Sequence, residues 1–215
     1  MPGAVTPSSF TTSIVGLVGF VIWHKISYIW LMLTAEKKKK YTVEDYMLLE
    51  EGAPFQLINY DLVMSPSPIP LHQVISIRFS NALVNFLDAI GDNGFIVAAP
   101  MDVKFDEGNV LQPDILYITE SRAAEMVTTR VEGAPDLVVE ILSPSTAYYD
   151  LRQKKDIYEK YGVKEYIIID PIQENAEVHI IKDDVYVLHQ KAQKTDTLHS
   201  VVLPGFSFDL NKIFR

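Results

Sequence analysis

One segment of the chain, DLVVEIL at residues 136–142, constrains the fold more than any other. Its nearly continuous apolar run is typical of a strand that is buried on both faces of a sheet. Glu140 interrupts this run. An ionised carboxylate is costly to bury unless it is paired or binds a metal, so Glu140 is either half of an ion pair or a metal ligand.

A second carboxylate, Asp114, opens the predicted strand DILYI at residues 114–118, directly after Gln112 and Pro113. A carboxylate at a strand start, beside a carboxylate in a neighbouring central strand, offers two oxygen ligands to one cation. Hard oxygen ligands favour Mg²⁺ or Mn²⁺ over zinc. The pair Asp114 and Glu140 therefore predicts a site for one of these cations.

Lys154 is the third candidate. It lies in a helix predicted between Ser145 and Tyr161, which should pack back over the sheet because it follows the strand of Glu140. By i, i+3 and i+4 spacing one face of this helix carries four residues, Leu151, Lys154, Tyr158 and Tyr161. Lys154 either reaches the carboxylates from this face or extends to solvent with its stem packed on the sheet.

The remaining pattern predicts an α/β domain, α+β-like, with a central mixed sheet flanked by helices. Thr42 and Asp45 form a capping box for a helix that ends at Gly52 and Pro54. The other expected elements are a hairpin at 55–64 turning at Asn59-Tyr60, a helix at 72–89, strands at 95–98, 101–105 and 165–169, a short helix at 122–126, a hairpin across Asp183-Asp184, and a terminal helix after Pro204-Gly205.

Composition narrows the chemistry. The 215 residues include no cysteine, which excludes disulfides, thiolate metal sites and a cysteine nucleophile. The net charge is -9, and residues 41–215 hold 14 basic and 27 acidic side chains, a net -13. This balance argues against a protein that coats nucleic acid through a broad basic surface. It does not exclude a nuclease with one local basic patch.

Residues 1–40 differ from the rest of the chain. The apolar segment 13–34 is long enough to span a bilayer, about 20 residues, but Lys25 near its middle costs roughly 2.5–3.5 kcal/mol on insertion. Either this segment is an anchor, with Lys37–Lys40 holding the following domain in the cytoplasm, or translation starts at Met32 and the protein is cytoplasmic. We therefore expect an N-terminal segment at 1–40 and a folded domain at 41–215.

The ordered series QPD at 112–114, VVEILSPST at 138–146, Asp150, Lys154, Tyr158 and GVKEY at 162–166 resembles the PD-(D/E)XK nuclease superfamily. More closely, it resembles the family of restriction endonucleases within it that is expanded in cyanobacteria. The resemblance runs from about Tyr41 to the C-terminus. It implies a restriction-endonuclease-like core and an Mg²⁺-dependent endonuclease that acts on DNA as a homodimer.

The resemblance also implies roles for single residues. Asp114, Glu140 and the backbone carbonyl of Ile141 would hold the cation, and Lys154 would act with them in catalysis. The usual motif places the lysine two residues after the second acid, where this chain has Leu142, and Lys154 matches the variants whose lysine has moved to the next helix.

Further residues are expected around this site. Gln56, His72, Asp102, Gln112 and Tyr158 would support it. Arg152 and Lys155, with Lys160 and Lys164, form a locally basic stretch that either meets the DNA backbone or is a solvated helix face.

A second function remains open. The family tends to carry Glu where this chain has Gln56, so a supporting carboxylate is missing. Together with the acidic domain, this supports a catalytically degenerate module that binds nucleic acid or regulates on the same fold. Ser143 and Ser145 lack a glycine elbow, which excludes a serine hydrolase of that type.

Overall fold

The structure, a computed structural model, describes residues 39–214. The chain divides into two compact units, Met1–Lys39 and Lys40–Arg215, and the second contains nearly all of the described residues. The expectations for the apolar segment 13–34 and for a start at Met32 fall outside the described residues. Between residues 39 and 214, no helix is both long and apolar enough to cross a bilayer.

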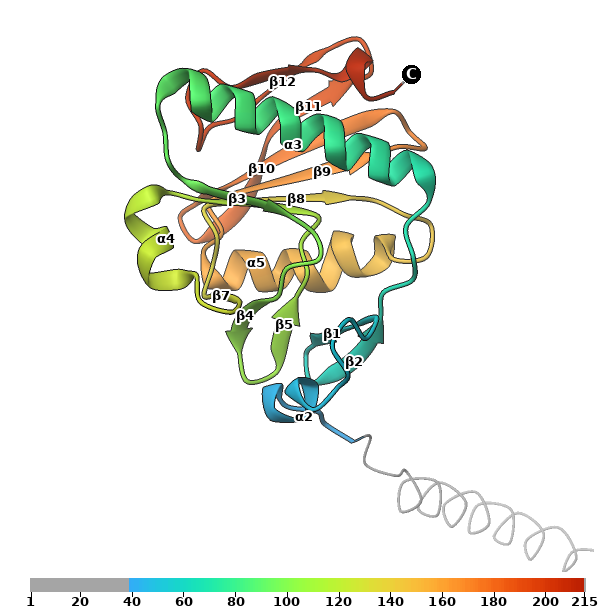
Figure 1. Ribbon diagram of the computed structural model, residues 1–215. Helices are drawn as coiled ribbons and strands as arrows, with labels where there is room; N and C mark the ends of the chain where they lie inside the picture. Colours follow the sequence, from blue (N-terminus) through green and yellow to red (C-terminus); the bar gives the residue numbers. More distant parts are fainter. Residues whose placement is uncertain (1–38, 215) are drawn as a thin grey trace, which may run out of the picture. The chain divides into compact units, whose positions relative to one another are not determined.

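A six-stranded mixed sheet forms the centre of the second unit (Figure 1). Its strands in spatial order are β11 (Val185–Gln193), β10 (Asn175–Lys182), β9 (Glu165–Asp170), β8 (Leu137–Ile141), β6 (Ile115–Ile118) and β3 (Phe95–Ala98). Only the β8–β9 pair of this sheet is parallel, and the other pairs are antiparallel. The predicted strand at 136–142 is therefore central, as its apolar run required.

Helices cover both faces of this sheet, with α3 (Pro70–Ile90) on one side and α5 (Lys155–Tyr161) on the other (Figure 1). Successive residues of a strand point to opposite faces. Leu137, Val139 and Ile141 accordingly pack in the core cluster that includes α3, whereas Val138 and Leu142 pack in the cluster that includes α5. Glu140 has the same parity as Val138, so its side chain belongs to the α5 face.

A second sheet of five short strands lies beside the site. Its strands in spatial order are β2 (Asp61–Met64), β1 (Phe55–Ile58), β5 (Asn109–Leu111), β4 (Val103–Asp106) and β7 (Val131–Glu132). The predicted hairpin at 55–64 is confirmed, and both turn residues, Asn59 and Tyr60, have positive φ, as a two-residue type I′ turn requires. The strands β5 and β7 were not predicted.

The structure confirms some of the predicted helices and corrects two of them. The capping box of Thr42 and Asp45 is present, but α2 (Val43–Met47) ends well before Gly52. Leu48 is exposed and Glu50 and Glu51 follow, so a longer helix would have no apolar face to bury. At the C-terminus, the expected helix is one 3₁₀ turn, η2 (Leu210–Lys212), after an unpredicted strand pair, β12 (Thr197–His199) and β13 (Ser207–Asp209). The helix α4 (Glu120–Met126) lies where a short helix was expected.

Candidate functional site

The site lies where two neighbouring strands separate. Strands β6 and β8 pair antiparallel from Ile115–Val139 onward, so the start of β6 meets the end of β8. Beyond that pair the ladder stops. At that point the Asp114 side chain replaces the neighbouring strand as a hydrogen-bond partner: its Oδ2 accepts a hydrogen bond from the backbone N–H of Ile141 at 2.7 Å. The carboxylate thus satisfies a strand amide that has left the ladder.

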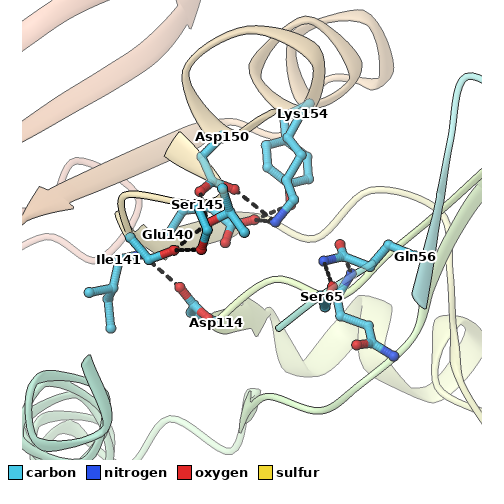
Figure 2. Close-up of polar contacts among 12 residues, drawn as sticks. Gln56, Ser65, Asp114, Glu140, Ile141, Ser145, Asp150 and Lys154 are labelled. Carbon is cyan, nitrogen blue, oxygen red and sulfur yellow. Dashed lines mark hydrogen bonds and ion pairs between the residues drawn. The ribbon is translucent and has the colours of Figure 1, made fainter. Parts of the chain in front are cut away.

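Glu140 lies at the end of β8 and is almost fully buried, with a side-chain exposure of 2%. Its Oε1 accepts hydrogen bonds from Lys154 Nζ at 3.0 Å and from the Tyr158 hydroxyl at 2.6 Å. Both donors come from the helical segment on the α5 face. Of the two alternatives for Lys154, the structure shows the one in which the lysine reaches the carboxylates: its side chain points inward rather than to solvent (Figure 2).

A carboxylate absent from the predicted site, Asp150, completes this cluster. Lys154 Nζ lies 2.9 Å from Asp150 Oδ1, and both side chains are buried. Thr146 Oγ1 donates to the other oxygen of Asp150 at 3.2 Å, and the Tyr166 hydroxyl donates to its backbone carbonyl at 2.9 Å. The Lys154 ammonium therefore sits between two carboxylates.

A π-helical turn, η1 (Tyr149–Lys154), carries both Asp150 and Lys154. The predicted face assumed regular α-helical spacing, which places Leu151 toward the sheet. The wider π turn instead buries Asp150 and leaves Leu151 exposed, so Leu151 does not belong to the sheet-facing set. Single π turns within α-helices occur frequently at functional sites, and this one continues directly into α5.

The charged groups of the cluster shift one another's pKa values. Burial raises the pKa of Glu140 above its usual range, although Lys154 and Tyr158 favour the ionised form. Burial alone would lower the pKa of Lys154, but the nearby carboxylates of Glu140, Asp150 and Asp114 raise it. Lys154 is therefore a permanent ammonium at neutral pH, and Glu140 is the group whose charge is least stable without a further cation.

His72 approaches Asp114 from the first turn of α3. Its Nε2 lies 3.0 Å from Asp114 Oδ2. Burial would lower the pKa of His72, but the carboxylates of Asp114 and Asp150 and the Ile141 carbonyl together raise it. The imidazole thus contacts the same Asp114 oxygen that accepts the Ile141 N–H, and its supporting role stays a prediction.

These side chains line a cavity of about 700 Å³. Among the described residues, the acidic and basic side chains that line it are Asp114, Glu140, Asp150, Lys154 and His72. Its other walls come from the β1–β2 hairpin, the segment 65–69, and the loop 143–146 after β8. Such a volume is typical of a small-ligand pocket.

Gln56 also lines the cavity, and both ends of its amide are in use. Its Nε2 donates to Ser65 Oγ at 2.7 Å and its Oε1 accepts from the Gln112 N–H at 2.8 Å (Figure 2). The Gln112 side chain in turn donates to Asp102 Oδ1 at 2.9 Å, which the Tyr46 hydroxyl also contacts. Asp102 is not among the residues that line the cavity and is linked to Gln56 through this chain of hydrogen bonds.

The basic stretch after the lysine does not gather at the site. Lys164 Nζ lies 2.7 Å from Asp136 Oδ1, at the start of β8, so it belongs to the other end of the strand. Lys160 lies 3.8 Å from Asp106, and Lys155 Nζ lies 3.3 Å from His179 Nδ1. Arg152 is exposed on η1 and does not line the cavity.

Oxygen donors for a cation are present but few. Within residues 39–214, no group of three or more His, Cys, Asp or Glu side chains is placed to hold one metal ion. The predicted set has two carboxylates and a backbone carbonyl. The contacts of Asp114 go to Oδ2 and those of Glu140 to Oε1, so Oδ1 and Oε2 remain for a further ligand. The donor set fits a hard cation that keeps several waters, as Mg²⁺ does.

A mixed central sheet with a helix on each face, and acidic residues with a lysine at one strand end, defines a restriction-endonuclease-like protein. A solved structure, described as a putative nuclease belonging to DUF820 from Anabaena variabilis, shares this fold with a TM-score of 0.69. The match is 17% identical and covers 80% of this chain and 97% of that one. The predicted fold and superfamily are confirmed.

The family follows from the sequence. A family model described as Uma2, "Putative restriction endonuclease", matches residues 43–211, and the chain belongs to this family. An uncharacterized protein of Synechocystis sp. is 29% identical over 146 residues, which cover 67% of this chain and 74% of the relative.

Proposed function

We propose that the protein is an Mg²⁺- or Mn²⁺-dependent endonuclease that hydrolyses phosphodiester bonds of DNA. One observation carries the proposal: the buried Lys154 ammonium contacts Glu140 beside Asp114 in one cavity. A buried ion pair is weak evidence for stability, since an apolar replacement is often as stable. The arrangement is better explained by chemistry, and the family membership supports the same reading.

Asp114, Glu140 and the Ile141 carbonyl would hold the cation. When bound, the cation would lower the pKa of a coordinated water and stabilise negative charge on the phosphate. Its charge would also offset the cost of ionised Glu140, whose pKa burial raises. Asp114 and Glu140 fit a divalent ion because their contacts within the described residues engage Oδ2 and Oε1 and leave Oδ1 and Oε2 for the cation.

The protein's own groups would prepare the site for the reaction. Lys154 would orient the attacking water or neutralise the charge that develops on the phosphate. Asp150 fixes the ammonium and Tyr158 fixes the carboxylate that accepts from it. His72 would hold Asp114 in the orientation that its 3.0 Å contact shows.

Cleavage of plasmid and of single-stranded DNA by the full chain in Mn²⁺ tests this function. Glu140→Ala and Lys154→Met should each abolish cleavage. Glu120→Ala on α4 and Lys182→Met at the end of β10, both exposed, remove the same charges away from the cavity and should cut like the wild type. Equal cleavage by wild type and Glu140→Ala would remove the basis of the proposal.

The second candidate is a degenerate module that binds nucleic acid or regulates without cutting. The neutral Gln56 and the acidic domain favour it. Calorimetric titration with Mg²⁺ and Mn²⁺ separates the two functions. Binding that Glu140→Ala abolishes supports the nuclease, and no binding at millimolar metal supports the module.

We further propose that the protein is a homodimer through the outer face of α3. Opposite its buried face, α3 exposes four apolar side chains that follow helical spacing, Leu71, Val74, Ile77 and Val84. A second copy can cover such a stripe by a two-fold contact between the same residues. Light scattering of the full chain should show a dimer that Ile77→Lys converts to a monomer, and a monomeric wild type would contradict this interface.

As part of the same proposal, the domain lies in the cytoplasm, where it would meet its DNA substrate. The two alternatives for residues 1–40 both allow it. The intact mass of the native protein distinguishes them, because a start at Met32 removes residues 1–31. Recovery of the longer form with the membrane fraction would support the anchor.

A further inference from the structure

The cavity offers few cations to a nucleic acid. Lys154 and His72 are the cationic side chains that line it within the described residues, and each already faces carboxylates. Proteins that hold duplex DNA use lysine and arginine contacts to a series of phosphates. This cavity has no such series, and Arg152 and Lys155 do not line it.

Neutral hydroxyl groups and prolines stand where phosphate-binding cations would be expected. Two short stretches of like composition line the cavity, residues 65–68 (Ser-Pro-Ser-Pro) and 143–146 (Ser-Pro-Ser-Thr). They donate hydrogen bonds without charge and add apolar ring surface. With three carboxylates also present, the walls favour contact with bases and sugars over contact with many phosphates.

Two adjacent tyrosines follow the second of these stretches. Tyr149 lines the cavity and is half-buried against the α5-side core. Tyr148 does not itself line the cavity, but its ring contacts the Tyr149 ring edge-on, with centroids 5.7 Å apart, and is 65% exposed. Aromatic faces beside a nuclease site are platforms for unpaired bases, since stacking requires that a base has left its duplex partner.

We propose that this site takes single-stranded DNA, with bases stacked on Tyr148 and Tyr149 and with the scissile phosphate as the main phosphate contact. A cavity of about 700 Å³ has the volume of a small-ligand pocket, which suits one or two nucleotides. The inference rests on the proposed nuclease function and specifies its substrate.

Fluorescence anisotropy with the full chain tests the proposal. Labelled single-stranded DNA and the matching duplex are titrated in Ca²⁺, which takes the same oxygen ligands as Mg²⁺, and a gel verifies that they remain intact. The single strand should bind at least about 10-fold more tightly than the duplex. With one or two phosphate contacts, its affinity should fall only about 3- to 7-fold between 50 and 200 mM salt.

Variants test the stacking. Tyr148→Ala and Tyr149→Ala should each weaken single-strand binding about 5- to 150-fold, and Tyr149→Phe should retain it. Thermal unfolding controls for Tyr149, which contacts the core. Tyr148 is exposed, so its variant should fold normally and keeps the test decisive.

The outcomes are distinct. Duplex binding as tight as single-strand binding, a steep salt dependence, or tyrosine variants that bind like the wild type would each overturn the inference. If metal-dependent cleavage of plasmid persists with any of these results, the nuclease function stands and only the substrate class is wrong. Absence of metal-dependent cleavage of both plasmid and single-stranded DNA would instead reject the proposed function.

Discussion

Asp150 Oδ1 lies 2.9 Å from Lys154 Nζ, four residues further along the π-helical segment, and both side chains are buried. Glu140 contacts the same ammonium from β8. The Lys154 ammonium therefore contacts one carboxylate from a strand and one from a helix, and substitutions can test the two carboxylates separately.

The change Asp150→Asn should destabilise the fold by about 1.5–3 kcal/mol, because it removes a charged partner from a buried ammonium. Cleavage should fall as well, since Lys154 would lose one of the two groups that fix it. Urea unfolding and plasmid cleavage measure the two effects. Asp156→Asn, an exposed position on α5, is the matched control and should change neither. A stable and fully active Asp150→Asn would show that Glu140 alone holds the lysine.

The change Glu140→Gln should separate folding from function. Burial raises the pKa of Glu140, so its charge is unfavourable in the folded protein, and glutamine still accepts from Lys154 and Tyr158. We expect Glu140→Gln in EDTA to be as stable as the wild type or more so. Added Mg²⁺ should raise the melting temperature of the wild type only, because only the wild type binds it. Equal rises in both proteins would contradict the ligand role.

The pH dependence of stability should have a marked contribution from Asp136, at the other end of β8. Burial would raise the pKa of Asp136, but Lys164, the Thr119 amide and Arg122 hold it below its usual value. A carboxyl whose pKa is lowered by folding stabilises the protein above its unfolded pKa, about 3.9. That stability is lost as the pH falls through the folded pKa.

Asp136→Asn should therefore cost about 1.5–3 kcal/mol at pH 7 and progressively less below about pH 4. Urea unfolding of both proteins between these pH values gives the difference. Cleavage at pH 7 should persist in the folded variant because Asp136 does not line the cavity. A difference independent of pH would show that the ion pairs are not its source.

The change Gln56→Glu should strengthen cation binding by about 10-fold, since it adds a carboxylate to the cavity. The new side chain can still accept from the Gln112 amide, and the Ser65 hydroxyl can rotate to donate to it. Calorimetry with Mg²⁺ measures the affinity. Gln73→Glu adds the same charge elsewhere in the cavity wall and should have a smaller effect. Equal gains would indicate a general charge effect instead of a specific ligand.

The sequence predicted the strand part of the site better than the helix part. Glu140 stood out because a charge in a buried strand needs a partner, and Asp114 because an antiparallel neighbour starts where β8 ends. Their position in one cavity agrees with the expectation, while their roles remain predictions. Asp150 lies in the motif series and four residues before Lys154, yet it was not included in the predicted site. Nothing in the sequence marks the π turn that leaves Leu151 exposed.

Sequence proximity also misled in one place. Lys164 follows Lys154 by ten residues but pairs with Asp136 at the far end of the strand, because the chain has by then crossed the sheet and begun β9. The second sheet could not be predicted either. Its strands are short, and β1 joins β5 through one pair, Leu57 and Val110, that are distant in the chain.

The π turn gives the helix one residue more than a regular α-helix would have over the same rise. The four-residue step from Asp150 to Lys154 is slightly less than one π turn, whereas the four-residue step from Lys154 to Tyr158 is slightly more than one α turn. The two small rotations around the helix axis are therefore in opposite directions. All three side chains therefore stay buried in one file instead of drifting around the helix. The irregular turn thus keeps a carboxylate, an ammonium and a hydroxyl aligned along the face that packs against Glu140.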